Sequence, residues 1–208
     1  MELIDAIFLV AIIMFSAVIH ELMHGVAANK LGDPTARLMG RLTLNPIVHL
    51  DMFGSIILPI ILTLTNSPLL FGWAKPVPYN PYNLRPGRWS EAIVAGAGPT
   101  SNLAIALFGG AVIRLGILPA GQNDILFLII VVNVMLFLFN LIPIPPLDGS
   151  KVLPAILPRS LSTGYDRWRI RMEGNPFMGM GTILIIILLL GSSFGSVVYA
   201  VAHTIAGV

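Results

Sequence analysis

Long apolar segments separated by short polar stretches dominate the chain. Four strong segments lie at about residues 6–28, 92–117 and 125–142, and from residue 177 onward. Each approaches the roughly 20 apolar residues that an α-helix needs to cross a bilayer. The pattern predicts an all-α polytopic membrane protein with a helical transmembrane core. We expect a single integral-membrane domain over residues 1–208, with its core at 6–151, and a C-terminal cytoplasmic segment and last transmembrane helix at 152–208.

Two apolar stretches are interrupted. Residues 52–70 contain glycine, proline and asparagine, which leave pieces too short for a comfortable span. We predict a re-entrant helix there, between the first and second core spans, with residues 38–44 and 72–79 returning as extended chain. Such irregular backbone survives at membrane depth only where protein or a water-filled cavity covers it. Glycine and serine at 191–195 interrupt the last segment, so residues 196–208 form either a short interfacial helix or the end of the same span.

The composition supports a membrane location. Hydrophobic residues make up 56% of the 208 residues and charged residues only 11%, with a mean hydropathy of +0.87. A soluble domain carries about 25% charged residues. A net charge of +2 is too small to suggest nucleic acid as a partner. Cysteine is absent, so any zinc site in this chain must use histidine and carboxylate ligands.

The first apolar segment ends in the motif His20-Glu21-Leu22-Met23-His24. Two histidines four residues apart lie on one face of a helix and can share one Zn²⁺, while the glutamate beside the first can polarise a water molecule at the metal. The spacing alone is a weak signal. Ionisable side chains inside a membrane span are costly, however, and more often mark a functional site than an accident. We therefore predict His20 and His24 as metal ligands and Glu21 as the catalytic acid/base.

Three groups of basic residues set the expected orientation. They are Lys30, Arg37 and Arg41 after the first span, Lys75, Arg85 and Arg88 before residue 92, and Lys151, Arg159, Arg167, Arg169 and Arg171 between the last two spans. Because loops rich in Lys and Arg remain in the cytoplasm, we expect the N-terminus outside. Residues 30–90 then begin and end on the same side, so 52–70 should not cross. His20 lies roughly 21 Å along a helix that needs about 30 Å to cross, which places the site inside the membrane toward the cytoplasm.

A catalytic zinc site usually has three protein ligands, so two histidines need a partner. Asp148 is the best candidate, because it follows the span ending on the same cytoplasmic side, after Pro143, Pro145 and Pro146 have unwound the helix, and Gly149 allows a tight turn. A solvated aspartate at a Pro-rich helix end is the plainer interpretation. His49, Asp51 and His203 are rival ligands: the first two fit polar or capping roles near the cytoplasmic rim, and the third a structural role near the opposite end.

Two asparagines in the apolar segments offer amides that can bind peptide backbone or an oxyanion. Asn140 is the stronger candidate for substrate binding. Asn102 belongs to a stripe of small residues at four-residue spacing, with Gly98, Ala106 and Gly110, that lets another helix approach closely. For Asn102 we therefore favour hydrogen bonding between helices over substrate binding.

Taken together, the motifs resemble those of the site-2 protease family of intramembrane zinc metalloproteases. The resemblance covers roughly residues 6–151 and rests on three motifs in the family's order: His20-Glu21-x-x-His24, Ala97-Gly98-Pro99-Thr100-Ser101-Asn102, and Asn140 through Asp148-Gly149. Residues 72–80 are also similar to the compact prokaryotic branch that lacks a PDZ domain. The resemblance implies one zinc ion held by His20, His24 and Asp148, catalysis by Glu21, a prokaryotic plasma-membrane location, and a transmembrane protein as substrate.

Two other classes of function compete with the protease. A membrane zinc transporter would need further metal-binding residues along a path, and only His49 and His203 remain for it. A non-catalytic membrane scaffold would tolerate loss of the glutamate or of a ligand, and every required residue is present. The sequence therefore favours a zinc metalloendopeptidase embedded in the lipid bilayer.

Overall fold

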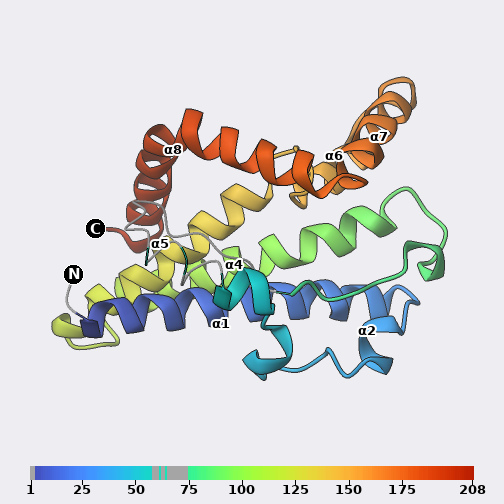
Figure 1. Ribbon diagram of the computed structural model, residues 1–208. Coiled ribbons are helices and arrows are strands. Elements are labelled where there is room, and N and C mark those ends of the chain that lie inside the picture. Colours follow the sequence, from blue (N-terminus) through green and yellow to red (C-terminus); the bar gives the residue numbers. More distant parts are fainter. Residues whose placement is uncertain (1–2, 58–60, 62–63, 65–74) are drawn as a thin grey trace. The chain divides into compact units, whose positions relative to one another are not determined.

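The computed structural model describes residues 3–57, 61, 64 and 75–208 (Figure 1). Every regular element in this part of the chain is helical, which confirms the predicted fold class. The α-helices are α1 Leu3–Lys30, α2 Thr35–Leu38, α4 Ser90–Arg114, α5 Asn123–Asn140, α6 Gly149–Ile156, α7 Arg159–Glu173 and α8 Pro176–Ala206. Four short helical turns join them: η1 Pro46–His49, η2 Met52–Ile57, η3 Pro81–Asn83 and η4 Ala120–Gln122.

Three of the described helices are long and apolar enough to cross a membrane: Ile7–Lys30 of α1, α4 and α5. Their bounds lie within a few residues of the predicted segments, because each ends where polar residues, glycine or proline begin. The chain is an integral membrane protein.

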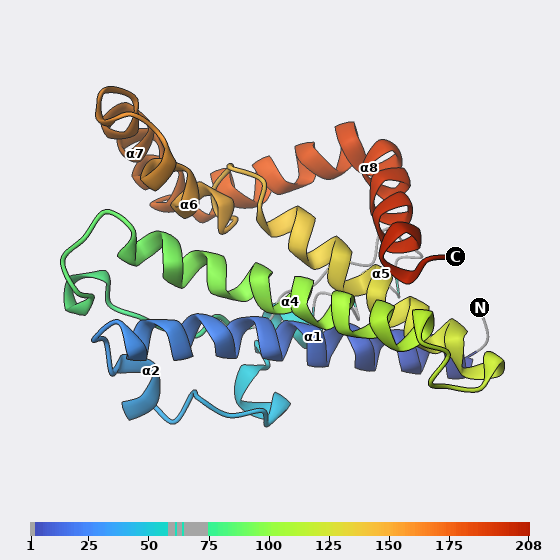
Figure 2. The same cartoon turned by 180° about the vertical axis from the view of Figure 1, so that it is seen from behind.

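Helix α8 departs from the simple pattern of one straight span. Figures 1 and 2 show that it changes direction between two straighter parts, and Gly/Ser pairs are a common cause of such kinks. Its first part, Phe177–Leu189, could form a span only together with α7, from which it is bent by 106°. Its second part, Ser193–Ala206, is a shorter apolar helix. The straight apolar runs are therefore shorter than the sequence pattern suggested.

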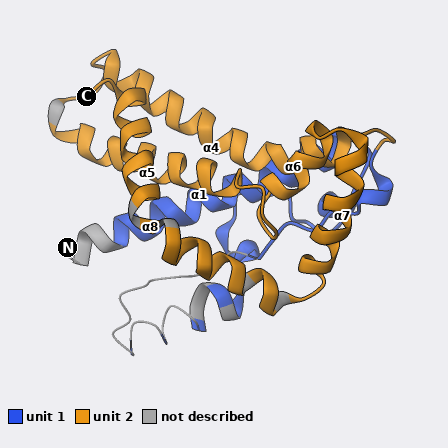
Figure 3. Ribbon diagram, turned by 90° about the horizontal axis from the view of Figure 1, so that it is seen from above, with its two compact units in different colours: residues 1–84 blue, residues 85–208 orange. Residues whose placement is uncertain are grey.

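The chain divides into two compact units, residues 1–84 and 85–208 (Figure 3). In the first unit, the buried Asp33 fixes the loop after α1. Its carboxylate accepts hydrogen bonds from the amide and hydroxyl of Thr35, at 3.2 and 2.5 Å, from the amide of Asn80 at 2.7 Å and from Nδ2 of Asn83 at 2.9 Å. Burial raises the pKa of Asp33, but these hydrogen bonds outweigh it and lower the pKa below its ordinary value. The ionised carboxylate thus ties residues 80–83 to the end of α1.

The second unit is built on α4, α5 and α8, with α4 and α5 side by side (Figure 2). Its core consists of buried small and branched residues from these helices: Ala106, Ile130, Val134, Val198, Ala202 and Ala206. The predicted small-residue stripe of α4 is buried at all four positions. At Gly110 an added Cβ would lie 2.5 Å from the carbonyl oxygen of Ile205, so this glycine lets α8 approach α4 closely.

Three predictions remain wholly or partly untested by the described residues. Most of the proposed re-entrant segment 52–70 lies outside the described residues, which show only η2 and two isolated positions there. Of the expected extended stretch 72–79, residues 75–79 have no regular secondary structure, and the rest lies outside the description. The organisation of residues 1–208 as a single domain stays a prediction.

Candidate metal centre

The side chains of His20 and His24 lie on one face of α1, with a ring nitrogen of each close to the other. Their Nε2 atoms are 3.0 Å apart, and the rings meet edge to face with centroids 4.7 Å apart. Both side chains are buried. Two nitrogens that bind one Zn²⁺ tetrahedrally at about 2.0–2.1 Å lie roughly 3.3 Å apart, which is close to the observed separation. This pair therefore fits two ligands of a zinc ion.

Glu21 is held by the chain that returns beside α1 within the first unit. Its carboxylate Oε2 accepts a hydrogen bond from the backbone N–H of Val77 at 2.8 Å. Proline flanks Val77 on both sides and has no N–H, so Val77 supplies the one amide donor of residues 76–78. The N–H of Lys75 donates to the carbonyl of His49 at 2.8 Å, which anchors the same stretch a second time.

A glycine next to the motif makes room for this returning chain. A Cβ at Gly25 would lie 2.6 Å from Cδ2 of Leu42 and 2.8 Å from Cγ1 of Val77. The absence of a side chain at position 25 therefore allows Val77 to lie close to α1, where its amide reaches Glu21.

The rival ligands make other contacts. Nε2 of His49 lies 2.9 Å from the carbonyl oxygen of Thr43, to which it donates, and Asp51 accepts a hydrogen bond from the N–H of Gly54 at 2.7 Å. In the second unit, Nδ1 of His203 donates to the carbonyl of Val208 at 2.9 Å. These contacts fit local structural roles.

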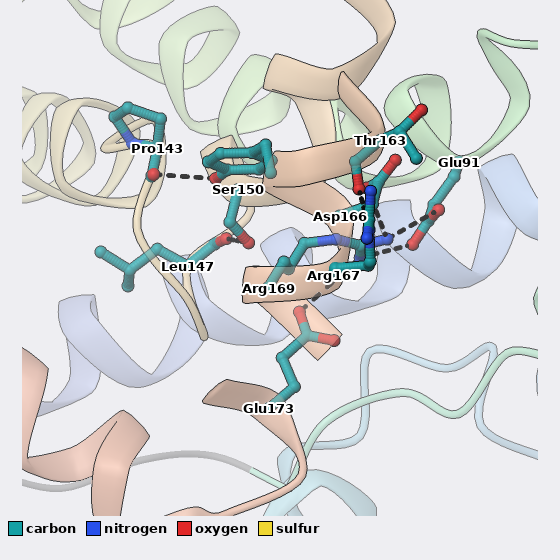
Figure 4. Close-up of polar contacts among 10 residues, drawn as sticks. Glu91, Pro143, Leu147, Ser150, Thr163, Asp166, Arg167, Arg169 and Glu173 are labelled. Carbon is teal, nitrogen blue, oxygen red and sulfur yellow. Dashed lines mark hydrogen bonds and ion pairs between the residues drawn. The ribbon is translucent and has the colours of Figure 1, made fainter. Parts of the chain in front are cut away.

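Asp148 lies in the second unit, in the turn between α5 and α6. The helix α5 ends at Asn140, and residues 141–148 form turns and bends before α6 begins at Gly149. The predicted unwinding at the prolines is thus confirmed. The hydroxyl of Tyr165 donates to the carbonyl of Pro143 at 2.8 Å and holds this turn against α7 (Figure 4). The half-buried Asp148 is therefore presented by an ordered turn, and its role as third ligand stays a prediction.

Gly149 is required by the close approach of this turn to the end of α5. An added Cβ would collide with the carbonyl oxygens of Leu141 and Ile142, the second at 2.7 Å. These are backbone atoms and cannot move aside as a side-chain tip can. The close packing explains the glycine directly after Asp148.

Gly149→Ala should lower the free energy of unfolding by about 1–3 kcal/mol or more, because the overpacked turn must shift. Thermal unfolding of the purified protein in detergent measures the change. Gly164→Ala on α7 is the matched control, since nothing lies within 4 Å of its added Cβ. Alanine in a helix is favourable there, so this variant should be as stable as wild type or slightly more stable. Equal stability of both variants would contradict the role given to Gly149.

The two asparagines differ in their contacts. Asn102 is fully buried, and its Nδ2 donates to Oδ1 of Asn133 at 2.9 Å, which links α4 to α5. The Nδ2 of Asn140 donates to the carbonyl of Leu136 within its own helix at 2.9 Å. A contribution of either amide to substrate binding stays a prediction.

The sequence did not lead us to the partners in two hydrogen bonds, Asn102 with Asn133 and Glu21 with the N–H of Val77. Asn133 is a lone amide in an apolar span, and such a residue needs a hydrogen-bond partner; this signal could have paired it with Asn102. No side chain marks the backbone N–H of Val77 as the hydrogen-bond donor to Glu21. Its two flanking prolines, which have no N–H, were the one indication that this N–H is the available donor of residues 76–78.

Comparison with known proteins places the chain in a family. Residues 116–165, which include Asn140, Asp148 and Gly149, match Peptidase family M50. YwhC of Bacillus subtilis, provisionally named a zinc metalloprotease, is 38% identical over 160 residues, which cover 73% of this chain and 69% of that protein. Rip2 of Mycobacterium tuberculosis, named in the same way, is 32% identical over 146 residues, which cover 67% of this chain and 53% of Rip2. No solved structure shows a significant match. The chain therefore belongs to peptidase family M50, the site-2 protease family.

Proposed function

We propose that this M50 metalloprotease is an intramembrane endopeptidase that hydrolyses peptide bonds in or near transmembrane segments of membrane proteins. The observation that carries the proposal is the pair of buried Nε2 atoms, 3.0 Å apart, on a helix apolar enough to span the bilayer. A water-requiring metal site in such a helix has its natural substrate in the same bilayer. Family membership and the names of the relatives support zinc as the metal.

The proposed site holds one zinc ion per chain through His20, His24 and Asp148. The assignment of Asp148 is supported by its sequence context and by its place within the segment that matches the family. When bound, zinc supplies Lewis acidity to the scissile carbonyl and to the attacking water.

Glu21 is proposed to move the proton. It takes a proton from the attacking water and later gives one to the leaving amine. The hydrogen bond from Val77 restrains one carboxylate oxygen, so the carboxylate is oriented before substrate arrives. A helical substrate must also unwind locally, because its carbonyls are otherwise occupied by helical hydrogen bonds.

Removal of the metal tests the proposal. The purified protein should contain about one zinc per chain and cleave a transmembrane test substrate in detergent micelles. A chelator should abolish cleavage, and added Zn²⁺ should restore it. Zinc binding without any cleavage of transmembrane substrates would favour a transporter or scaffold instead.

We further propose that the N-terminus lies outside and the active site faces the cytoplasm. Because the chain has no cysteine, single cysteines can report this topology. Cysteines at Lys30 and Arg88 should resist a membrane-impermeant thiol reagent in sealed cells and react after the membrane is opened. Both should behave alike, since residues 30–90 begin and end on one side in this topology.

A cysteine at Gly121 is the matched control. This exposed position follows α4, and a Cβ there meets nothing within 4 Å. In the proposed topology it faces outward and should react in sealed cells. External labelling at residue 88 but not at residue 30 would mean that 52–70 crosses the membrane, which would refute both the re-entrant segment and Asp148 as third ligand.

A further inference from the structure

A polar pocket of about 310 Å³ lies in the second unit among α4, α6 and α7. The volume suits a small ligand or a head group. All of its lining residues belong to the second unit, whereas the His20–His24 motif belongs to the first. Six charged side chains line it: Arg88, Lys151, Arg159, Arg169, Glu91 and Asp166.

Arg169 engages both carboxylates of the pocket (Figure 4). Its guanidinium nitrogens lie 2.9 Å from Glu91 and 3.4 Å from Asp166, and Glu173 outside the pocket adds a third contact at 3.7 Å. Burial lowers the pKa of Arg169, but the hydrogen bond and charge of Glu91 and the charges of the other two carboxylates raise it overall. Both carboxylates of the pocket, Glu91 and Asp166, are therefore already paired with Arg169.

Arg88 and Arg159 add positive charge that the carboxylates of the pocket do not engage. Arg88 donates to the carbonyls of Pro154 and Leu157, and these neutral partners leave its charge uncompensated. The exposed guanidinium of Arg159 has no ion-pair partner within the described part of the chain. Four cations against two carboxylates line the pocket, a difference of two positive charges. An anion is the ligand that this balance favours.

Two further observations point to an acceptor-rich ligand. Arg169 is only 8% exposed, and its Nε is buried without a hydrogen-bond partner among the residues that the structure describes. A buried donor of this kind is costly unless a ligand or water accepts from it. In addition, α7 begins at Arg159 beside the pocket, and its N-cap Pro158 provides no side-chain cap in the described structure. Backbone N–H groups and the dipole at a helix N-terminus favour an anion.

We propose that this pocket binds a phosphate-bearing anion, with Lys151 and Arg159 as its principal side-chain contacts. The phosphate of an anionic lipid head group and that of a soluble phosphate ester offer the same chemistry. Phosphate oxygens would supply acceptors for cationic side chains and for the helix terminus.

Titration calorimetry of the full chain in neutral detergent tests this site at constant ionic strength. The probes are dioctanoyl phosphatidylglycerol, dioctanoyl phosphatidylcholine and inorganic phosphate. Lys151→Gln combined with Arg159→Gln should weaken binding of the anionic probes at least about tenfold. Arg167→Gln combined with Arg171→Gln removes the same charge from exposed positions of α7 outside the pocket and should leave binding unchanged.

The single variant Arg159→Gln gives a second measurement, because this exposed side chain can be changed without repacking. It should show a smaller loss than the double variant. Weakened binding of phosphatidylglycerol alone identifies a lipid, and weakened binding of inorganic phosphate identifies a soluble ester; either result supports the site. No saturable anion binding, equal binding of phosphatidylcholine, or equal losses in the two double variants would overturn it.

Discussion

Glu21→Gln is expected to abolish cleavage while zinc stays bound. Glutamine keeps the size of the side chain and an amide oxygen that can still accept from the N–H of Val77, so the packing beside α1 is retained. It cannot accept a proton from water at neutral pH. Loss of general acid–base catalysis costs roughly 10²–10⁴-fold in rate. The cleavage rate of a transmembrane test substrate and the zinc content of the same sample measure the two effects together.

The control for this variant is Glu173→Gln, which removes one carboxylate from the end of α7 outside the metal centre. Its turnover should equal that of wild type. Retained turnover in Glu21→Gln would show that another group moves the proton. Loss of zinc in Glu21→Gln would instead show that Glu21 helps to bind the metal, and its assigned role would be wrong.

The helices and the histidine pair were predictable because their signals are local. A run of apolar residues sets the length of α1, and a spacing of four residues places His20 and His24 on one face whatever the rest of the chain does. The turn before α6 was predictable for the same reason, since consecutive prolines cannot continue α5.

Contacts that depend on where the chain of the first unit returns were not predictable. The amide of Val77 is 56 positions from Glu21, and every residue but proline carries the same amide donor. The hydrogen bonds of Asp33 to residues 80–83 likewise depend on where the chain returns. The bend of α8 was visible only as a Gly/Ser interruption, because sequence periodicity does not fix the direction that a helix takes after a kink.

Asp148→Ala should remove most of the zinc, since a site left with two histidines lacks the three protein ligands usual in catalytic centres. Changes in groups that merely orient zinc ligands already cost about 10–100-fold in affinity, so loss of a ligand should cost more than about 100-fold. The change should leave the start of α6 intact, because within the described chain the Asp148 side chain makes no capping hydrogen bond to that helix.

Elemental analysis after dialysis against a weak chelator measures the zinc that remains, and thermal unfolding in detergent checks the fold. Asp124→Ala, at the exposed start of α5, removes the same chemical group at the opposite end of that helix and should keep full zinc content. Full occupancy in Asp148→Ala would refute the ligand assignment and direct attention to His49 or Asp51. Combining Asp148→Ala with His49→Ala or Asp51→Ala would then identify the third ligand, because only removal of the true ligand empties the site.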